Sequence, residues 1–231
     1  MPRPTREEQI PNLQEAIKET AWKLIAKNGA SSLSLRAIAR ELKITAPAIY
    51  NYFPSRDDLV TALAVDALLS LEDAQKKSLE PIPVDKLEKR LTMLGLAYRD
   101  WAIQHEQHYQ LIFSTTIPGY EVPDNSTIHA AAWAMLPLIE TVQALYALGK
   151  LRVERLPKLT TKLKAMLKGW KESIGESGRE VHIEALYLAF VIWSRVHGLV
   201  TLELCHQTPP FVTDPGEIYR REIESIKIQY L

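Results

Sequence analysis

Side chains that can donate hydrogen bonds to an anion are concentrated between residues 34 and 56 of this 231-residue chain. Phosphate oxygens accept hydrogen bonds from serine, threonine, tyrosine, asparagine and arginine, and an arginine can also bind a guanine edge through two parallel bonds. The segment therefore has the chemistry of a nucleic-acid contact. Its polar candidates are Ser34, Arg36, Thr45, Tyr50, Asn51, Tyr52 and Arg56.

A helix that begins after Ser34 is predicted to carry the first of these side chains. Serine is a preferred N-cap residue, and apolar residues then recur at helical spacing. One face of this helix should contact a core, and the opposite face, with Arg36, should contact solvent. The apolar positions are Leu35, Ile38, Ala39 and Leu42.

A second short helix, about two turns long, follows a tight turn, and the two form a helix-turn-helix. Thr45 can cap it, and Pro47 is tolerated in its first turn, where N–H groups have no partner within the helix. Ile49 and Phe53, four residues apart, pack inward, and Pro54 ends the helix. This leaves Thr45, Ala46, Ala48, Asn51 and Tyr52 for other contacts.

The next helix is predicted to start with a capping-box pair, Ser55 and Asp58, and to continue to about Leu79. No glycine or proline interrupts it. It should form a stiff connection between a small head, residues 1–56, and a larger body, residues 57–231.

Residues 49–59, Ile-Tyr-Asn-Tyr-Phe-Pro-Ser-Arg-Asp-Asp-Leu, resemble the signature of TetR-family transcriptional regulators. The similarity extends from about Leu13 to Leu63, roughly a quarter of the chain. It implies a three-helix DNA-binding head on an all-α body for effector binding and dimerisation. At Lys43 the family usually has a glycine, so this lysine must adopt a different turn or accept backbone strain at positive φ.

The resemblance also implies which residues hold phosphates, namely Ser34, Tyr50, Tyr52 and Arg56. Such contacts would position the head without specifying a sequence. For Tyr50 an alternative is a structural hydrogen bond within the head.

Residues at the start of the second helix are expected to reach base edges in a major groove. Ala46 and Ala48 would offer only apolar contacts to thymine methyl groups. Arg36 matches a base-contacting arginine of some family members and is therefore expected to read a guanine, which gives about 1–3 kcal/mol of discrimination. A phosphate-bound or solvent-facing arginine is the alternative. The candidates on the second helix are Thr45, Ala46, Pro47 and Ala48.

The charge distribution agrees with this assignment. The net charge is zero, but residues 1–56 contain nine Lys and Arg against five Asp and Glu, which leaves 19 against 23 for the rest of the chain. A basic head on a slightly acidic body suits a protein that contacts a polyanion through one end. A chance asymmetry is the alternative.

The rest of the chain is predicted to be an all-α bundle, because helical periodicity recurs without a strand pattern. The expected helices cover residues 84–105, 107–114, 128–148, 181–205 and 217–230, and the loop 117–126 could border a pocket. The lysine-rich stretch 150–171 is interpreted as a solvated face over an apolar stripe, with a second nucleic-acid surface as the alternative.

A homodimer interface is assigned by the resemblance to residues 181–206 and 217–230. Apolar residues occur on more than one face of 181–205, as in a helix covered both by its own body and by a partner. Two-fold symmetry implies a palindromic operator in double-stranded DNA, with half-sites about 34–36 Å apart. Two dimers per operator are an alternative.

A small-molecule effector is expected in the body, where the family usually keeps an inducer pocket. Residues 193–198, Trp-Ser-Arg-Val-His-Gly, resemble the Trp-His-Gly signature of one class of TetR C-terminal domains, which does not fix the ligand. An ordinary core role is the alternative for each candidate. The candidates are Tyr98, Trp101, His105, Phe113, Trp133, Trp193 and His197.

Other chemistries have weaker signals. His105 and His108 could hold a metal, but no further ligand pair lies nearby, and Cys205 is expected to be a buried thiol rather than a redox switch. The sequence contains no Gly-rich phosphate loop, nucleophile elbow or paired-carboxylate motif. No metal, cofactor or catalysis is therefore expected.

The composition favours a cytoplasmic protein. One cysteine excludes an intramolecular disulfide and suits a reducing compartment. The longest apolar run, residues 185–193, is shorter than the roughly 20 residues of a membrane span, and the N-terminus lacks the apolar core of a signal peptide. It resembles a flexible arm, in which Arg3 and Arg6 could lie along DNA.

The combined prediction is a dimeric, ligand-responsive transcriptional regulator that acts as a repressor. Two rivals remain. One is an all-α enzyme with catalytic groups drawn from His105, Glu106, His108 or His197. The other is a helical partner-binding protein that no longer binds DNA.

Overall fold

The computed structural model describes residues 12–114, 117, 119–120, 127–178 and 180–231. Every regular element in these ranges is helical, which confirms the all-α prediction. The arm with Arg3 and Arg6 and most of the predicted loop 117–126 lie outside the described residues. Contacts divide the chain into a head unit, Met1–Ala67 with Gln107–Thr127, and a body unit, Leu68–Glu106 with Ile128–Leu231.

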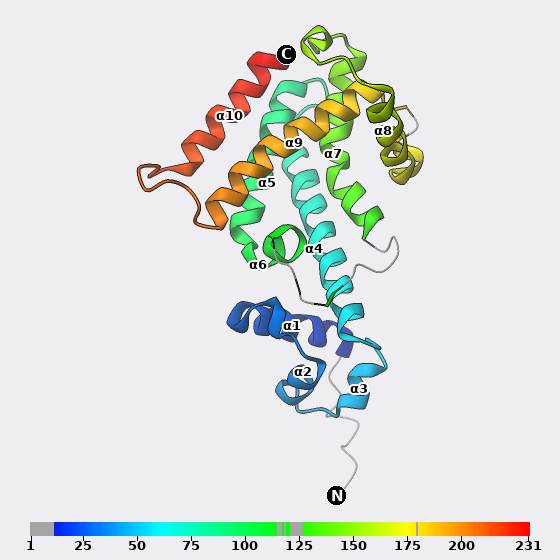
Figure 1. Cartoon of the computed structure of the whole chain (residues 1–231), viewed down its shortest axis with the longest axis vertical. Helices are drawn as coiled ribbons and strands as arrows, with labels where there is room; N and C mark the ends of the chain where they lie inside the picture. The colour runs from blue at the N-terminus through cyan, green and yellow to red at the C-terminus, as the bar shows by residue number, and fades with distance from the viewer. Residues whose placement is uncertain (1–11, 115–116, 118, 121–126, 179) are drawn as a thin grey trace, which may run out of the picture. The chain divides into compact units, whose positions relative to one another are not determined.

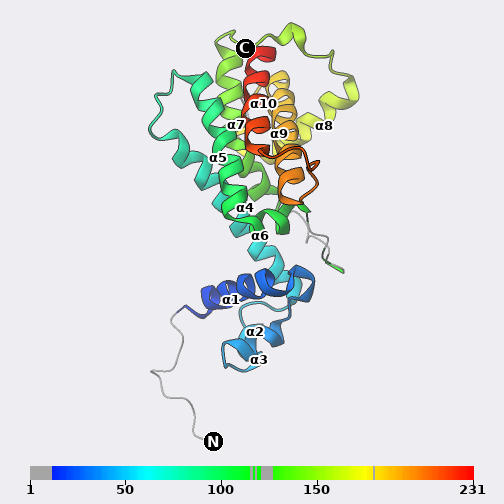
Figure 2. The ribbon, with the colours of Figure 1, turned by 90° about the vertical axis from the view of Figure 1, so that its left-hand side faces the viewer.

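The head unit contains the predicted helix-turn-helix. In both views α2 and α3 lie on the same side of α1 (Figures 1 and 2). The helix α3 has five residues and is shorter than the predicted two turns. The elements are α1 (Leu13–Asn28), the 3₁₀ turn η2 (Ala30–Ser32), α2 (Leu35–Glu41), α3 (Ala46–Tyr50) and the first part of α4 (Arg56–Leu79).

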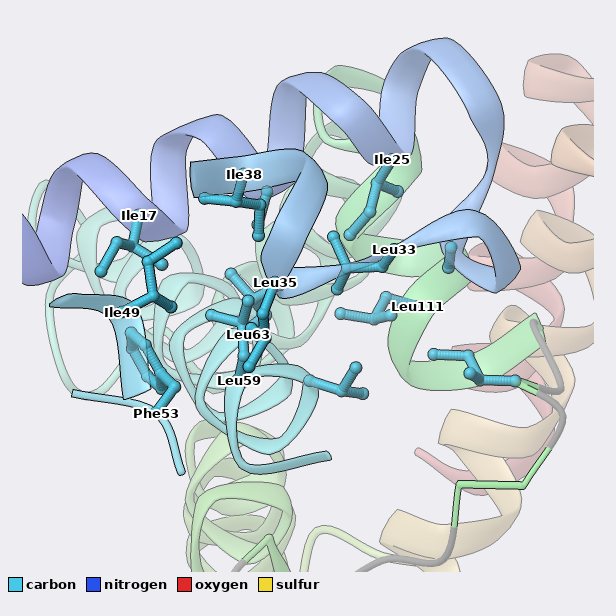
Figure 3. Packing of buried hydrophobic residues seen from close by; sticks show 14 of the residues in the cluster. Ile17, Ile25, Leu33, Leu35, Ile38, Ile49, Phe53, Leu59, Leu63 and Leu111 are labelled. Atoms are coloured by element: carbon cyan, nitrogen blue, oxygen red, sulfur yellow. The ribbon is translucent and has the colours of Figure 1, made fainter. Parts of the chain in front are cut away.

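One apolar cluster holds these helices together (Figure 3). Ile17, Ile38 and Ile49 come from α1, α2 and α3, and all three are fully buried. Leu59 and Leu63 from the first turns of α4 are equally inaccessible. Burial of each such side chain contributes about 1.5–3 kcal/mol. Because helices as short as α2 and α3 are unstable alone, this packing is what keeps them folded.

A later segment of the chain completes the same cluster. After α6 (Glu106–Tyr109), the π-helical turn η3 (Gln110–Ser114) carries Leu111 into the core of the head unit, and Ile117 joins it. Both side chains are buried, with 9% and 7% of their surface exposed. Figure 3 shows Leu111 beside Leu33 and close to the α4 residues.

The head unit defined by contacts differs in extent from the predicted domain 1–56, and that domain division stays a prediction. The head unit includes α4 up to Ala67 and the described residues between Gln107 and Thr127. The hydroxyls of Thr61 and Tyr120 lie 3.0 Å apart and join these two additions. Of the predicted loop, Ile117 and Tyr120 thus pack within the head unit.

The start of α4 has the predicted capping box. The Asp58 carboxylate accepts a hydrogen bond of 2.9 Å from the Ser55 N–H, and the Ser55 Oγ accepts one of 3.1 Å from the Asp58 N–H. The helix then continues without a break to Leu79, so that its residues belong to both units.

The body unit is a helical bundle. Its helix α9 packs against α7, α8 and α10, and α5 packs against α7, α9 and α10. Most predicted boundaries are confirmed within three residues, but only the second half of the lysine-rich stretch is an α-helix. The elements are α5 (Leu87–Gln104), α7 (Ile128–Ala147), the 3₁₀ turn η4 (Val153–Arg155), α8 (Thr161–Ser173), the 3₁₀ turn η5 (Gly175–Gly178), α9 (Ile183–Leu204) and α10 (Pro215–Tyr230).

A buried glutamine ties α4 to α7 within the body unit. The Gln75 side-chain amide donates 2.8 Å to the carbonyl of Ala134, and only 4% of Gln75 is exposed. The receiving turn of α7 contains Pro137, which has no N–H to donate within the helix.

Two helices of the body unit resemble membrane spans in length and composition. The mean hydropathy over a window of 18 residues is 1.2 for α7 and 1.5 for α9. The sequence-based expectation of no spanning helix used a different criterion, the length of the longest unbroken apolar run. Buried core helices of bundles pass the same test, and these two pack against each other. Half of the α7 window and 39% of the α9 window are buried within the chain.

Candidate nucleic-acid interface

The predicted DNA-contacting side chains lie on the outside of the head unit. Tyr50 and Tyr52 are 44% and 46% exposed, whereas Ile49 and Phe53 beside them are buried. The same segment thus faces its polar residues outward and its apolar residues into the core. Arg36, Thr45, Pro47 and Asn51 are also exposed, and Ser34, Ala46, Ala48 and Arg56 are partly buried.

Arg36 lies on the solvent-facing side of α2. Within the described part of the chain its guanidinium makes no hydrogen bond and no ion pair. Lys18 on α1 is different, since its ammonium is 2.7 Å from both Asp66 and Glu15. The Arg36 side chain is therefore not engaged in holding the head together.

Ser34 and Thr45 occupy the N-cap positions of α2 and α3, as predicted, with extended backbones. Neither side chain makes the capping hydrogen bond. Among the described residues, neither hydroxyl has another hydrogen-bond partner. Both hydroxyls can therefore bind an external group.

Lys43 forms the turn between α2 and α3 with a left-handed backbone, φ 55°. Its N–H donates 3.2 Å to the carbonyl of Arg40, and the N–H of Ile44 donates 3.0 Å to that of Ala39. This pair of bonds is the Schellman motif, which normally has glycine at the left-handed position. Of the two possibilities left open for Lys43, the chain adopts the strained one, at about 1–2 kcal/mol.

Arg56 has an internal role that the sequence did not suggest. Its guanidinium donates 3.2 Å to the carbonyl of Ser31 and 3.5 Å to that of Ala30. These bonds fasten the start of α4 to the turn η2. Phosphate binding by Arg56 stays a prediction, and it would have to coexist with this contact.

The structure brings together three of the predicted effector residues in the body unit. Tyr98 Oη is 2.8 Å from His197 Nδ1, and the His197 ring stacks on Trp193 with 4.8 Å between centroids. Burial lowers the pKa of His197 below its ordinary value, which favours the neutral imidazole. The group offers an aromatic surface with a polar hydroxyl–imidazole pair.

The other predicted effector residues lie elsewhere. Trp101 is buried and donates 3.1 Å to Ser70 Oγ, with the ring of His105 at 5.8 Å. Trp133 is 45% exposed on α7. Phe113 belongs to the head unit, where its ring lies 5.1 Å from that of Tyr109.

A polar hollow of about 410 Å³ lies in the body unit, apart from these aromatic residues. None of the predicted effector residues lines it. Its lining consists of Glu88, Gly149, Lys150, Leu151, Arg152, Glu154 and Leu231.

The metal alternative has no support in the described residues, where no three His, Cys, Asp or Glu side chains form a group that could hold an ion. His108 instead stacks on Trp22 of the head unit, with 3.9 Å between ring centroids. Cys205 is partly exposed rather than fully buried.

The two helices predicted to form the dimer interface retain exposed apolar side chains. Phe190 and Leu202 on α9 are 47% and 41% exposed, and Ile218 and Ile228 on α10 are 45% and 71% exposed. Between the two helices Arg195 forms an ion pair with Glu222, which fixes their packing.

A helix-turn-helix with an outward-facing arginine and tyrosine set, joined to a helical bundle, defines a DNA-binding regulator. Family models agree for both parts. Residues 17–63 match the model described as bacterial regulatory proteins of the tetR family, and residues 91–226 match the tetracyclin repressor-like C-terminal domain. The chain belongs to the TetR family of transcriptional regulators.

Individual relatives support this assignment. The HTH-type transcriptional regulator Rv1816 of Mycobacterium tuberculosis is 28% identical over 210 residues, covering 90% of this chain and 87% of its own. The solved structure of regulatory protein SCO4313 is 31% identical with a TM-score of 0.73, and the alignment covers 98% of each chain.

The fold alone is shared with the TetR-family regulator PfmR from Thermus thermophilus, at 16% identity and a TM-score of 0.59 over 92% of this chain and 97% of that one. Regulators of this family are transcription factors rather than enzymes, and they bind DNA and typically dimerise. The enzyme rival is thereby set aside.

Proposed function

We propose that this chain is a dimeric repressor that acts in the cytoplasm, binds a palindromic DNA operator through its head unit and is released by a small-molecule effector. The observation that carries the proposal is the outward-facing set on α2, on α3 and in the turn after α3, above all Arg36 and Tyr52, over a buried apolar core. These side chains can donate the hydrogen bonds that phosphate oxygens and base edges accept.

Within the interface the residues divide by role. Arg36 reads a guanine, while residues 45–48 at the start of α3 lie against the bases. The DNA backbone phosphates are held by four residues, which set the register of the head on the DNA. These are Ser34, Tyr50, Tyr52 and Arg56.

Dimerisation through residues 181–206 and 217–230 is supported by the exposed apolar residues of α9 and α10. An exposed Phe190 or Ile228 is unfavourable in water, and a second copy of the same helices would cover it. A two-fold dimer carries two heads, so each operator contains two half-sites.

Effector binding is supported by the cluster of Tyr98, Trp193 and His197. We infer an apolar or aromatic effector with one polar group, since such a ligand would stack on Trp193 and bond to the hydroxyl–imidazole pair. A ligand that prefers the body conformation with weaker DNA affinity releases the operator by its differential binding. The helix α4, shared by both units, is the element proposed to transmit this change.

Selection of DNA from a random-sequence pool near physiological salt tests the proposal. We expect enrichment of a palindrome whose half-sites are about one helical turn apart. Thr45→Glu places a negative charge in the interface and should abolish enrichment. Thr161→Glu makes the same change on α8 of the body unit and should not.

Weak binding that falls steeply with salt and enriches no sequence would contradict the repressor proposal. If a palindrome is enriched, it can be used to screen for compounds that release the protein from this operator. Tyr98→Phe should weaken the response to an active compound, whereas Tyr146→Phe, the same change at a ring that stacks on His182, should leave it unchanged.

A further inference from the structure

Three described helices end in the same way. The helices α2, α7 and α9 are each followed by a left-handed residue: Lys43 (φ 55°), Gly149 (φ 64°) and His206 (φ 53°). At each end the N–H of this residue and the next N–H donate to carbonyls of the last helical turn, over 2.9–3.2 Å. Only one of the three positions has glycine, the residue without a steric penalty there.

No contact of the Lys43 side chain among the described residues of the head unit offsets this backbone strain. Its side chain is exposed, and in the described ranges it forms neither an ion pair nor a hydrogen bond. A cation near the end of a helix is favoured by the helix dipole, but that interaction is weak at an exposed site. Glycine would close the turn with less strain, whereas the exposed ammonium group of Lys43 is available for a contact outside the chain.

The position of the turn indicates what that use is. Lys43 lies between Arg36 on α2 and Thr45 at the start of α3, both exposed in the candidate interface. In both views this turn lies on the side of the head unit that faces away from α1 (Figures 1 and 2). An ammonium on a flexible four-carbon side chain can reach a phosphate beside a helix-turn-helix without precise placement.

We propose that Lys43, although it strains the turn, binds a backbone phosphate of DNA. The inference rests on the proposed DNA-binding function. The lysine ammonium donates to a phosphate oxygen, so the contact strengthens binding to every sequence and adds nothing to specificity. Each such contact releases counterions and adds about 0.9 to the slope of log K against log salt concentration.

Three substitutions separate charge from strain. Lys43→Arg keeps both the charge and the strain, Lys43→Gln keeps the strain without the charge, and Lys43→Gly removes both. His206→Gly is the matched control, because it relieves the same kind of turn in the body unit without changing the head. The readouts are denaturant unfolding of the protein alone and the salt dependence of binding to a duplex of arbitrary sequence.

We expect Lys43→Gly and His206→Gly to raise the unfolding midpoint. Lys43→Gly and Lys43→Gln should weaken binding by the same factor, about threefold to tenfold for each head, and lower the salt slope by about 1.8 for a dimer. Lys43→Arg and His206→Gly should bind like the unchanged protein.

Two results would overturn the inference alone. Tight binding by Lys43→Gly with an unchanged salt slope excludes the phosphate contact, and a lower unfolding midpoint for this variant excludes the strain. If the unchanged protein binds no duplex at low salt, the proposed function fails together with this inference. The experiment does not depend on finding an operator, because a phosphate contact is independent of sequence.

Discussion

At the scale of single residues, similar side chains in the head unit have opposite roles. Arg36 is exposed and forms no hydrogen bond or ion pair with any residue that the structure describes, whereas Arg56 donates to backbone carbonyls of η2. Sequence resemblance assigned both to DNA. The structure adds that one of them also stabilises the protein.

For Arg36 we predict a change in specificity without a change in stability. Arg36→Ala should reduce discrimination at one base pair of each half-site by about 1–3 kcal/mol, because the bidentate contact to guanine is lost. Affinities for single-base variants of the selected operator measure this. Unchanged selectivity would refute the assignment. Arg40→Ala, at another exposed position of α2, is the control.

For Arg56 we predict the reverse. Arg56→Ala should lower the free energy of unfolding by about 1–2 kcal/mol, because the carbonyls of Ser31 and Ala30 lose a charged donor. Denaturant unfolding is the measurement. Normal stability combined with weak DNA binding would show that Arg56 acts only at the phosphate.

His197 predicts how the stability of the body unit depends on pH. Burial lowers its pKa in the folded protein, while the unfolded chain retains a value of about 6.5. Between these two values the unfolded state binds more protons, so stability rises with pH and falls on acidification below about pH 6.5.

In His197→Asn the pH-dependent contribution of the imidazole to stability should disappear. The difference in unfolding free energy between the unchanged protein and this variant should therefore vary with pH below about 6.5. Urea unfolding from pH 7.5 to pH 4.5 tests it. A difference that is independent of pH would contradict the prediction. His129→Asn on α7 is the control for an imidazole whose surroundings are exposed.

At the scale of elements, the head is built from two separated parts of the chain. The helices α1 to α3 and the start of α4 are followed forty residues later by the segment with Leu111 and Ile117, which fills the same core. Truncating the Leu111 side chain should therefore destabilise the head unit, although in sequence this residue lies between helices α5 and α7 of the body unit.

Leu111→Ala should destabilise the head unit by about 2–3 kcal/mol, since it removes buried methyl groups and leaves a cavity. DNA binding should weaken in parallel. Leu148→Ala makes the same substitution at a residue that is 62% exposed and should have almost no effect. Hydrogen exchange of the α1 and α2 amides, faster in the first variant only, locates the change.

The elements also show which structural features could be predicted from the sequence. Helix α2 and the Ser55–Asp58 capping box were predicted because both depend on neighbours within one or two turns. The packing of Leu111 and the carbonyl contacts of Arg56 were missed, because they join residues far apart in sequence and have no local signal. Among the effector candidates, Trp193 and His197 came from the Trp-His-Gly resemblance and the others were chosen by residue type. In the described part of the chain, Tyr98, Trp193 and His197 gather in one cluster.

At the scale of the whole molecule, the exposed apolar residues of α9 and α10 predict a dimer. Leu202→Arg and Ile218→Arg should each weaken the association of two copies by about tenfold or more, because a charge would be buried in the interface. Sedimentation velocity over a range of concentrations measures this. Met166→Arg on α8, which replaces a residue that is 63% exposed, should leave association unchanged.

Operator binding should fail with dimerisation, since one head engages only one half-site. A Leu202→Arg protein that is monomeric but binds the palindrome with full affinity would contradict the dimer proposal. A protein that stays dimeric would instead place the interface on another face of the body.

The packing of Leu111 and Ile117 in the core of the head unit also bears on the order in which the protein folds during synthesis. A nascent chain emerges from the ribosome with its N-terminus first, and domains usually fold as soon as they are complete. The apolar core of the head unit is not complete at residue 67, since Leu111 and Ile117 are still to be translated. A truncated product that ends before α6 thus has an unfinished core, which limits its capacity to occupy DNA sites meant for the full regulator.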